Sequence, residues 1–203
     1  MNYLAIDTSG KNLTVIICKD GKTEYFFDPE CGVNHSVSLM PQIESLCEKT
    51  GFDLEKADFF SAVVGAGSFT GIRIGVSTIK ALCFAYQKPA LSITSFDTIA
   101  YNATGGKVLA VIDAGHNGFY VCGYEDLKVV LPPCYLLKDQ LLRIKDDYRV
   151  LSSNQIDDIN CETVSVLDGL INAINQKLGE TLEDLDALTP LYVRKSQAEE
   201  GRK

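Results

Sequence analysis

The stretch Val63-Val64-Gly65-Ala66-Gly67-Ser68-Phe69-Thr70-Gly71-Ile72-Arg73-Ile74-Gly75 decides the fold of this chain. The apolar run Phe59–Val64 predicts a buried strand, and the residues from Gly71 to Tyr86 predict a long helix. Glycines let the backbone turn sharply between the two, and Ser68 or Thr70 is expected to cap the helix. Strand, loop and helix in this order indicate an α/β protein, in which such a loop often holds an anion.

The glycine loop does not match the common nucleotide-binding or hydrolase motifs. A Walker loop requires a lysine beside its second glycine, and no lysine lies within reach of Gly65, Gly67 or Gly71. The dinucleotide motif has its third glycine one position earlier than Gly71. A hydrolase elbow requires glycines two residues before and after its serine, and Ser68 lacks both. A tight turn with a capped helix is therefore favoured over a phosphate cradle.

The residues before this stretch predict a three-stranded antiparallel unit followed by a helix. Apolar and β-branched runs predict strands at 3–6, 13–18 and 23–27, with a further strand at 89–93. Asp20-Gly21 predicts a two-residue hairpin turn. Residues 35–50 predict a helix that ends at Gly51, and Pro41 predicts a kink in it or a later start. One face of this helix is expected to carry Leu39, Met40, Ile43, Leu46 and Cys47.

The second half of the chain repeats the plan of the first half. A strand, the pair Ile-Asp, a small-residue turn and a second strand occur at Leu4–Cys18 and again at Val108–Tyr124. The repeat places Asp113 at an offset of 106 residues from Asp7. The sequence therefore predicts two lobes of related β-rich structure.

The turn-forming residues 102–107 are the predicted linker, which divides the chain into a lobe at 1–103 and a shorter lobe at 104–203. The first lobe is expected to end with a short helix capped by Ser95 or Asp97. The second lobe is predicted to continue with a strand and an amphipathic helix, at 149–151 and 164–178.

The net charge of -8 argues against a broad grip on a phosphate backbone, which requires clustered lysine and arginine. The seven cysteines are odd in number and lack zinc-ligand spacing, which indicates reduced thiols rather than disulfides or a metal site. The two histidines, His35 and His116, are not spaced as metal ligands on one helix. The chain shows no basic leader and no long apolar run, so we expect a cytoplasmic protein without a membrane span.

Two features remain as candidates for function. Asp7-Thr8-Ser9-Gly10 resembles the first phosphate turn of the actin, sugar-kinase and Hsp70 superfamily, and ordinary turn chemistry is the alternative. The hypothesis of a vestigial phosphate turn includes Asp7, Thr8, Ser9, Gly67, Ser68 and Asp113. The second feature is a stripe of small residues on the helix after the loop, which would let another helix approach its backbone. Packing of that helix onto its own sheet is the alternative.

Four motifs together resemble the TsaB (YeaZ) family of bacterial proteins needed for the threonylcarbamoyl modification of adenosine 37 in tRNAs that read ANN codons. They are Leu4-Ala5-Ile6-Asp7-Thr8-Ser9, His35-Ser36 with Leu39-Met40-Pro41, the glycine stretch 65–75, and Pro190-Leu191-Tyr192-Val193-Arg194-Lys195. Ala66 departs from the family, which usually has proline there.

The resemblance implies a two-lobed actin-like fold with duplicated ribonuclease H-like lobes. It also implies a scaffold that is not an enzyme by itself and that pairs with the catalytic paralogue TsaD and with the ATPase TsaE. The metal-binding histidines of TsaD would correspond to Ser95 and Ile99, so the chain is expected to bind no metal and no cofactor tightly. ATP, metal and tRNA are expected on the partners.

The same resemblance assigns the partner interface to the helices after His35 and Gly71, and a homodimer through these helices would compete with the heterodimer. The interface residues are expected to be His35, Leu39, Gly71, Arg73, Ile74, Gly75, Thr78, Lys80 and Leu82. Two alternatives stay open, an ATP-dependent phosphotransferase of the actin-like class and, with less support, a glycopeptidase-like metallopeptidase.

Overall fold

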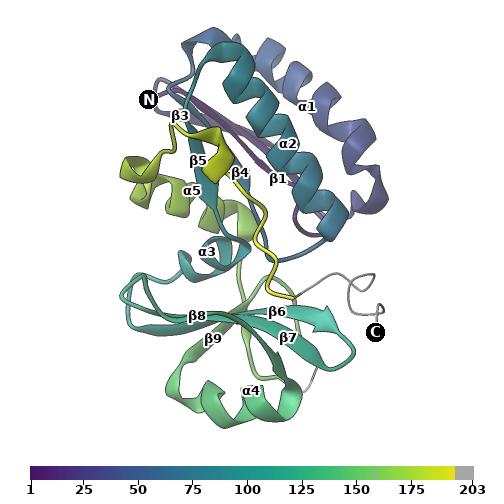
Figure 1. Cartoon of the computed structure of the whole chain (residues 1–203), viewed down its shortest axis with the longest axis vertical. Helices are drawn as coiled ribbons and strands as arrows, with labels where there is room; N and C mark the ends of the chain where they lie inside the picture. Colours follow the sequence, from purple (N-terminus) through teal and green to yellow (C-terminus); the bar gives the residue numbers. More distant parts are fainter. Residues whose placement is uncertain (158, 195–203) are drawn as a thin grey trace. The chain divides into compact units, whose positions relative to one another are not determined.

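The computed structural model describes residues 1–157 and 159–194 (Figure 1). The chain forms two compact units. Of the described residues, the first contains Met1–Ile93 and the returning segment Lys177–Pro190, and the second contains the rest of the chain from Thr94 to Gln176 and residues 191–194. The division predicted after Ala103 differs from the observed one, because the helix after residue 93 belongs to the second unit and a later segment returns to the first. Lys195, the last residue of the C-terminal motif, lies outside the described residues.

The first unit is built on a five-stranded mixed sheet in the order β3-β2-β1-β4-β5. Its strands are β1 Tyr3–Asp7, β2 Leu13–Lys19, β3 Lys22–Asp28, β4 Phe59–Val63 and β5 Ala90–Ile93. The first three are antiparallel neighbours, and β4 and β5 run parallel to β1. Asp20 and Gly21 both have positive φ, as the predicted hairpin turn requires. The strands predicted in this half of the chain are therefore confirmed.

Two helices lie side by side on one face of the first sheet (Figure 1). They are α1 His35–Thr50, preceded by the 3-10 turn η1 Gly32–Asn34, and α2 Phe69–Tyr86. The helix α1 includes Pro41, so the alternative of a later start is wrong, and it ends at Gly51 with φ 60° as predicted. The Ser68 hydroxyl accepts a hydrogen bond from the Gly71 amide at 3.2 Å. Ser68 is thus the N-cap of α2.

A C-terminal segment covers the outer edge of the first sheet. Ala90 of β5 and Leu182 exchange two backbone hydrogen bonds, at 2.9 and 2.7 Å. Leu182 lies between the 3-10 turns η4 Leu178–Glu180 and η5 Leu185–Ala187, and η2 Leu54–Lys56 precedes β4. The edge of β5 is therefore paired by residues more than 80 positions later in the sequence.

The second unit repeats the same topology in a second five-stranded sheet, β10-β9-β6-β7-β8. Its strands are β6 Lys107–Gly115, β7 Gly118–Glu125, β8 Lys128–Leu137, β9 Arg149–Ser152 and β10 Glu162–Thr163. As in the first sheet, three antiparallel strands are followed by two parallel ones. The predicted duplication is therefore confirmed at the level of strand order.

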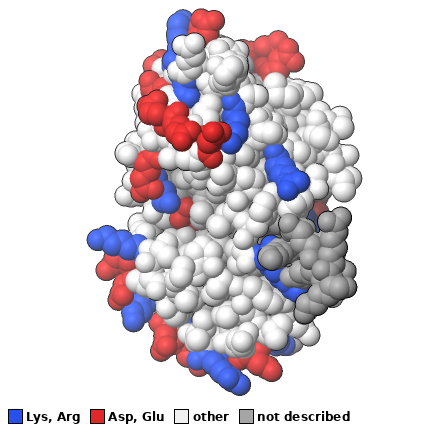
Figure 2. All heavy atoms as spheres, in the orientation of Figure 1, with Lys and Arg blue, Asp and Glu red and all other residues white. Residues whose placement is uncertain are grey.

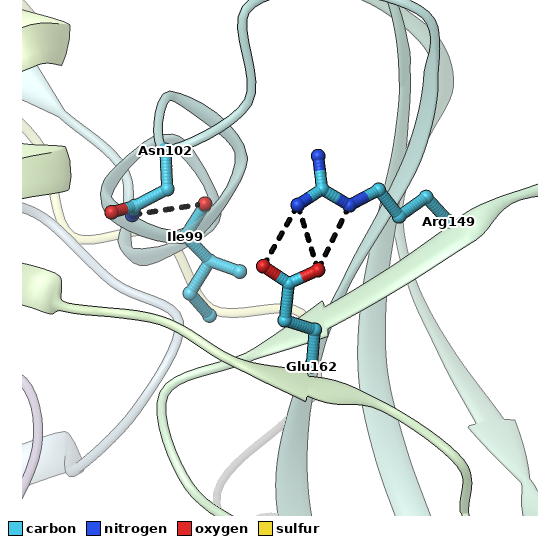
Figure 3. Close-up of polar contacts among 4 residues, drawn as sticks. All are labelled: Ile99, Asn102, Arg149 and Glu162. Atoms are coloured by element: carbon cyan, nitrogen blue, oxygen red, sulfur yellow. Dashed lines mark hydrogen bonds and ion pairs between the residues drawn. The ribbon is translucent and has the colours of Figure 1, made fainter.

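The outer parallel pair of the second sheet is joined by an ion pair. The Arg149 guanidinium donates to both carboxylate oxygens of Glu162 at 2.7 to 2.9 Å, which links β9 to β10 (Figure 3). The helix α4 Lys138–Ile144 and the 3-10 turn η3 Lys145–Asp147 connect β8 to β9, and α4 packs on one face of this sheet. The core of this side is formed by Leu109, Val111, Phe119, Val121, Leu141, Val150, Ile156 and Ile159.

Two further helices of the second unit, α3 Ser95–Ala100 and α5 Val166–Gln176, pack closely on each other. A Cβ atom at Gly169 of α5 would overlap the Thr98 carbonyl oxygen, so glycine is required at this crossing. The N-cap of α3 is Thr94, and the Thr94 amide donates a hydrogen bond to the Asp97 carboxylate at 2.9 Å. The cap was expected at Ser95 or Asp97, and Asp97 takes part as the third residue of a capping box.

Among residues 1–157 and 159–194, no helix is long and apolar enough to cross a membrane.

Candidate functional site

The β1–β2 turn, residues 8–12, is organised by the carboxylate of Asp7. The Ser9 amide and the Ser9 hydroxyl donate to Asp7 Oδ1 at 2.8 and 2.7 Å. The Asn12 side-chain amide lies 3.5 Å from Asp7 Oδ2 and donates to the Thr14 hydroxyl at 3.2 Å. Asp7 is 3% exposed. The carboxylate therefore serves as the acceptor that closes its own turn.

The pKa of Asp7 lies above its ordinary value. Burial is the main cause, because removal of water disfavours the charged form. The hydrogen bonds from Ser9 and Asn12 and the nearby imidazole of His35 favour the charged form and oppose the shift. The turn around Asp7 therefore partly offsets the increase in pKa that burial causes.

The turn packs directly against the glycine loop and the first turns of α2. Cβ atoms at Gly67 and Gly71 would overlap the carbonyl oxygens of Ser9 and Thr8. A Cβ atom at Gly75 would lie 2.6 Å from the Thr8 hydroxyl oxygen. These glycines are therefore required by contact with the chain's own backbone.

This contact corrects the prediction that the small-residue stripe faces outward. Gly71 and Gly75 are buried, and the Thr8 hydroxyl donates to the Gly71 carbonyl at 2.7 Å. The alternative, in which this side of α2 packs onto its own sheet, is the observed arrangement. The structure thus brings Asp7, Thr8, Ser9, Gly67 and Ser68 together, as the hypothesis of a vestigial phosphate turn required. The Gly65–Ala66 peptide bond in this loop is cis.

Asp7 and Ile6 point to opposite faces of the first sheet. A Cβ atom at Gly75 of α2 would lie 3.9 Å from Ile6 Cδ1, so Ile6 faces α2. Successive side chains of a strand point to opposite faces, and Asp7 follows Ile6 in β1. Asp7 therefore lies on the face opposite to α2.

Asp113 occupies a different position in the second sheet. Val111 of β6 packs in the core with Leu141 of α4, and Asp113, two residues further on, points to this same helix-bearing face. Asp113 is exposed, and its carboxylate accepts a hydrogen bond from the Gly115 amide at 2.7 Å. The two aspartates form similar local turns on opposite faces, so the prediction that Asp113 is the structural counterpart of Asp7 is corrected.

Several large apolar side chains are exposed on the outer surface of α1 and α2. On α1 and the turn before it, exposed fractions are 94% for Val33, 73% for Val37 and 51% for Met40. On α2, Phe84 is 81% exposed and Phe69 is 38% exposed. Figure 2 shows that few charged side chains lie over these two helices. We call this surface the α1–α2 face, and it consists of Val33, Val37, Met40, Phe69, Ser77, Ala81, Leu82 and Phe84.

A shallow hollow of about 280 Å³ lies in this face, lined by Met40 of α1 and by residues of α2. The residues of α2 that line it are Ser77, Thr78, Ala81 and Leu82. The Arg73 guanidinium lies over the Phe69 ring, 3.8 Å from its centre, so this cation covers an aromatic side chain at one end of the face. An exposed apolar area of this kind on a folded unit is typical of a protein-binding surface.

The predicted interface residues divide into two groups. His35, Leu39, Gly71 and Gly75 are buried within the first unit. Arg73 is exposed, and the half-exposed residues are Ile74, Thr78, Lys80 and Leu82.

Sequence reasoning missed Val33, Val37 and Phe84, and it expected Met40 on the core face, where Leu39, Ile43 and Leu46 are buried. The i, i+4, i+7 spacing of Val33, Val37 and Met40 was the available signal.

In the described part of the chain, His, Cys, Asp and Glu form no group of three that is arranged to hold a metal ion. The seven cysteines are free thiols, as predicted. Burial raises the pKa of Cys83 to about 12, which keeps this thiol protonated near neutral pH.

Two units with the same strand order, three antiparallel strands followed by two parallel ones, define a protein of the actin-like class with ribonuclease H-like units. The family described as TsaD, tRNA N6-adenosine threonylcarbamoyltransferase, matches residues 29–146. A crystal structure described as an uncharacterized protein with similarity to peptidase YEAZ from Pseudomonas aeruginosa has a TM-score of 0.79. It is 22% identical and covers 95% of this chain and 99% of its own, which shows the shared fold.

Two curated relatives share more sequence with the chain. The tRNA threonylcarbamoyladenosine biosynthesis protein TsaB of Bacillus subtilis is 30% identical over 98% of this chain and 96% of its own length. The protein of the same description from Escherichia coli is 29% identical over 62% of this chain and 55% of its own length. The chain therefore belongs to the TsaB (YeaZ) family of tRNA threonylcarbamoyladenosine biosynthesis proteins, which is related to TsaD.

Proposed function

We propose that this chain is a non-catalytic, activating subunit that pairs through its α1–α2 face with a TsaD-like catalytic subunit. The pair, joined by a TsaE-like ATPase, carries out the threonylcarbamoylation of adenosine 37 in tRNAs that read ANN codons. The observation that carries the proposal is the exposed apolar surface of two adjacent helices in a member of this family. Burial of Phe84 and Val37 against a partner removes apolar area from water, which favours association.

The charge of the chain supports an indirect role toward tRNA. With a net charge of -8, the protein would be repelled by a phosphate backbone, so tRNA is held by the partners and contacts this chain only in the complex. We further propose that ATP and metal ions are bound by the partners, and that the complex acts in the cytoplasm. A homodimer through the same face would compete with the partner.

The test is a measured affinity between this chain and the TsaD-like protein of the same organism. We expect co-elution on a sizing column at micromolar concentration, and a titration that follows one-to-one binding. Separate elution at these concentrations would refute the pairing. A calorimetric titration of the isolated chain with Mg-ATP is expected to give no heat of binding, and tight binding would favour the phosphotransferase alternative.

Variants of the apolar surface locate the interface. Phe84→Ser should weaken the pairing about tenfold to a hundredfold, since a large exposed aromatic anchor is removed without loss of core packing. Val37→Ser should weaken it by a smaller factor. The matched control is Val129→Ser, which removes a 54% exposed valine from the second unit and should leave the affinity unchanged. Equal effects of the two valine variants would place the interface elsewhere.

A further inference from the structure

The β1–β2 turn holds the beginning of α2. The Thr8 hydroxyl donates to the carbonyl of Gly71 at 2.7 Å, and the Ser68 amide donates to the carbonyl of Ser9 at 2.7 Å. Thr8 is fully buried, and its hydroxyl oxygen would also contact a Cβ atom at Gly75. These contacts fix both the cap and the first turns of the helix.

The same turn holds the beginning of α1. The Gly32 amide donates to the carbonyl of Lys11 at 2.8 Å, just before α1. The imidazole Nε2–H of His35, the first residue of α1, donates to the carbonyl of Asn12 at 2.8 Å. His35 is 4% exposed, so this hydrogen bond is shielded from water.

One short turn therefore contacts the beginning of both helices of the α1–α2 face, with one hydrogen bond to each helix and one to the segment just before it. Its own shape is fixed from the inside by the Asp7 carboxylate, which accepts from the amide and the hydroxyl of Ser9. The side chains of Thr8, Ser9 and His35 are buried, so a partner on the α1–α2 face does not touch them.

We propose that residues 8–12 are a positioning element that sets the placement of α1 relative to α2, with Thr8 and His35 as its positioning residues. The proposal rests on the proposed function, because the quantity that the turn controls is the shape of the partner-binding surface. A shift of one helix start by a fraction of an ångström changes the hollow between Met40 and Ala81, into which a partner side chain would fit. Complementarity at the centre of an interface depends on such spacing.

The experiment compares Thr8→Val with Thr8→Ser. Valine has the shape of threonine but lacks the donor to Gly71, whereas serine keeps the donor. We expect Thr8→Val to weaken partner binding by about threefold to tenfold, and Thr8→Ser to bind within about twofold of wild type. His35→Phe removes the donor to Asn12 and tests the α1 side in the same way, which keeps the proposal testable if Thr8→Val does not fold.

A control separates positioning from general stability. Ile156→Val shortens a buried side chain of the second core and should lower the melting temperature without a change in partner affinity. The proposal is overturned if Thr8→Val binds like wild type, if Thr8→Ser is as weak as Thr8→Val, or if affinity falls equally in Ile156→Val.

Hydrogen exchange provides a readout that does not depend on the partner. Thr8→Val should increase exchange of the amides in the first turns of α2, and His35→Phe that of the amides at the start of α1. If wild type does not bind a TsaD-like protein but exchange rises as expected, the proposed function fails and the positioning role stands. If exchange is unchanged in both variants, the positioning role fails whatever the partner does.

Discussion

The two sheets have the same strand order, yet they differ in how their last two strands are connected. In the first unit, the glycine loop and the 18-residue helix α2 connect β4 to β5. In the second unit, residues 153–161 connect β9 to β10, and the described residues of this segment, all but 158, contain no helix. Ile156 and Ile159 of this segment enter the second core directly. The α1–α2 face therefore includes the helix α2, which is an element in which the two units differ.

The largest effect is expected from Gly75→Leu, which disrupts the contact between α2 and the β1–β2 turn. The described part of the second unit has no helix in the place of α2. The side chain would overlap the Thr8 hydroxyl, so we expect the free energy of unfolding to fall by roughly 3 kcal/mol or more. Urea denaturation measures the loss. The control is Gly179→Leu, because a Cβ atom at Gly179 has open space around it. A stable Gly75→Leu protein would mean that α2 moves away from the turn at little cost.

The outer edge of the first sheet is the next point to test. Leu182→Pro removes the amide that donates to the Ala90 carbonyl, and we expect a loss of about 1 to 3 kcal/mol of unfolding free energy. Leu182→Ala keeps this amide and should cost less. Thermal unfolding of the two variants gives the difference. If the alanine variant is as unstable as the proline variant, the backbone pairing at β5 contributes nothing.

The smallest expected effect concerns the two aspartates. The raised pKa of Asp7 means that the folded state binds its proton more tightly than the unfolded chain does. Its favourable contribution is therefore complete below the ordinary pKa of 3.8 and is lost as the pH rises through the folded-state pKa. Asp7→Asn lacks this titration, so relative to the variant the wild type should lose stability as the pH rises.

Urea titrations at a series of pH values between about 4 and 7 measure this difference. Asp113→Asn is the matched control, because this carboxylate is exposed in the second unit. A profile for Asp7→Asn that runs parallel to that of wild type would show that the pKa of Asp7 is not raised.

Most strands were predictable from sequence, because β-branched runs bounded by Asp-Gly or glycine specify strands locally. The duplication was also visible in the repeat around Asp7 and Asp113. The equivalence of these two residues was not predictable, since an offset of one position reverses the face of a strand and only the packing of Ile6 and Val111 reveals it. The return of Lys177–Pro190 to the first unit depends on distant pairing, which local patterns do not encode.

The predicted partner interface on α1 and α2 stays a prediction, but Gly71 and Gly75, which it included, lie on the side of α2 that packs against the β1–β2 turn. Small residues at helical spacing fit a partner helix and an internal contact equally well, so Gly71 and Gly75 did not distinguish the two cases. The contact of both glycines with Thr8 shows that this side of α2 packs inside the first unit. The apolar residues Val37 and Phe84 carried the useful signal, because they lie outside the helical face that the core requires.

The pairing of Leu182 with Ala90 has a consequence for synthesis of the protein. A ribosome delivers β1 to β5 first, but the segment that covers β5 is made only after the entire second sheet. During this interval the edge of β5 carries backbone groups that another nascent chain can pair with. A chain that ends after residue 176 would contain both sheets but leave the edge of β5 unpaired. Chaperones and proteases should therefore recognise such a truncated chain.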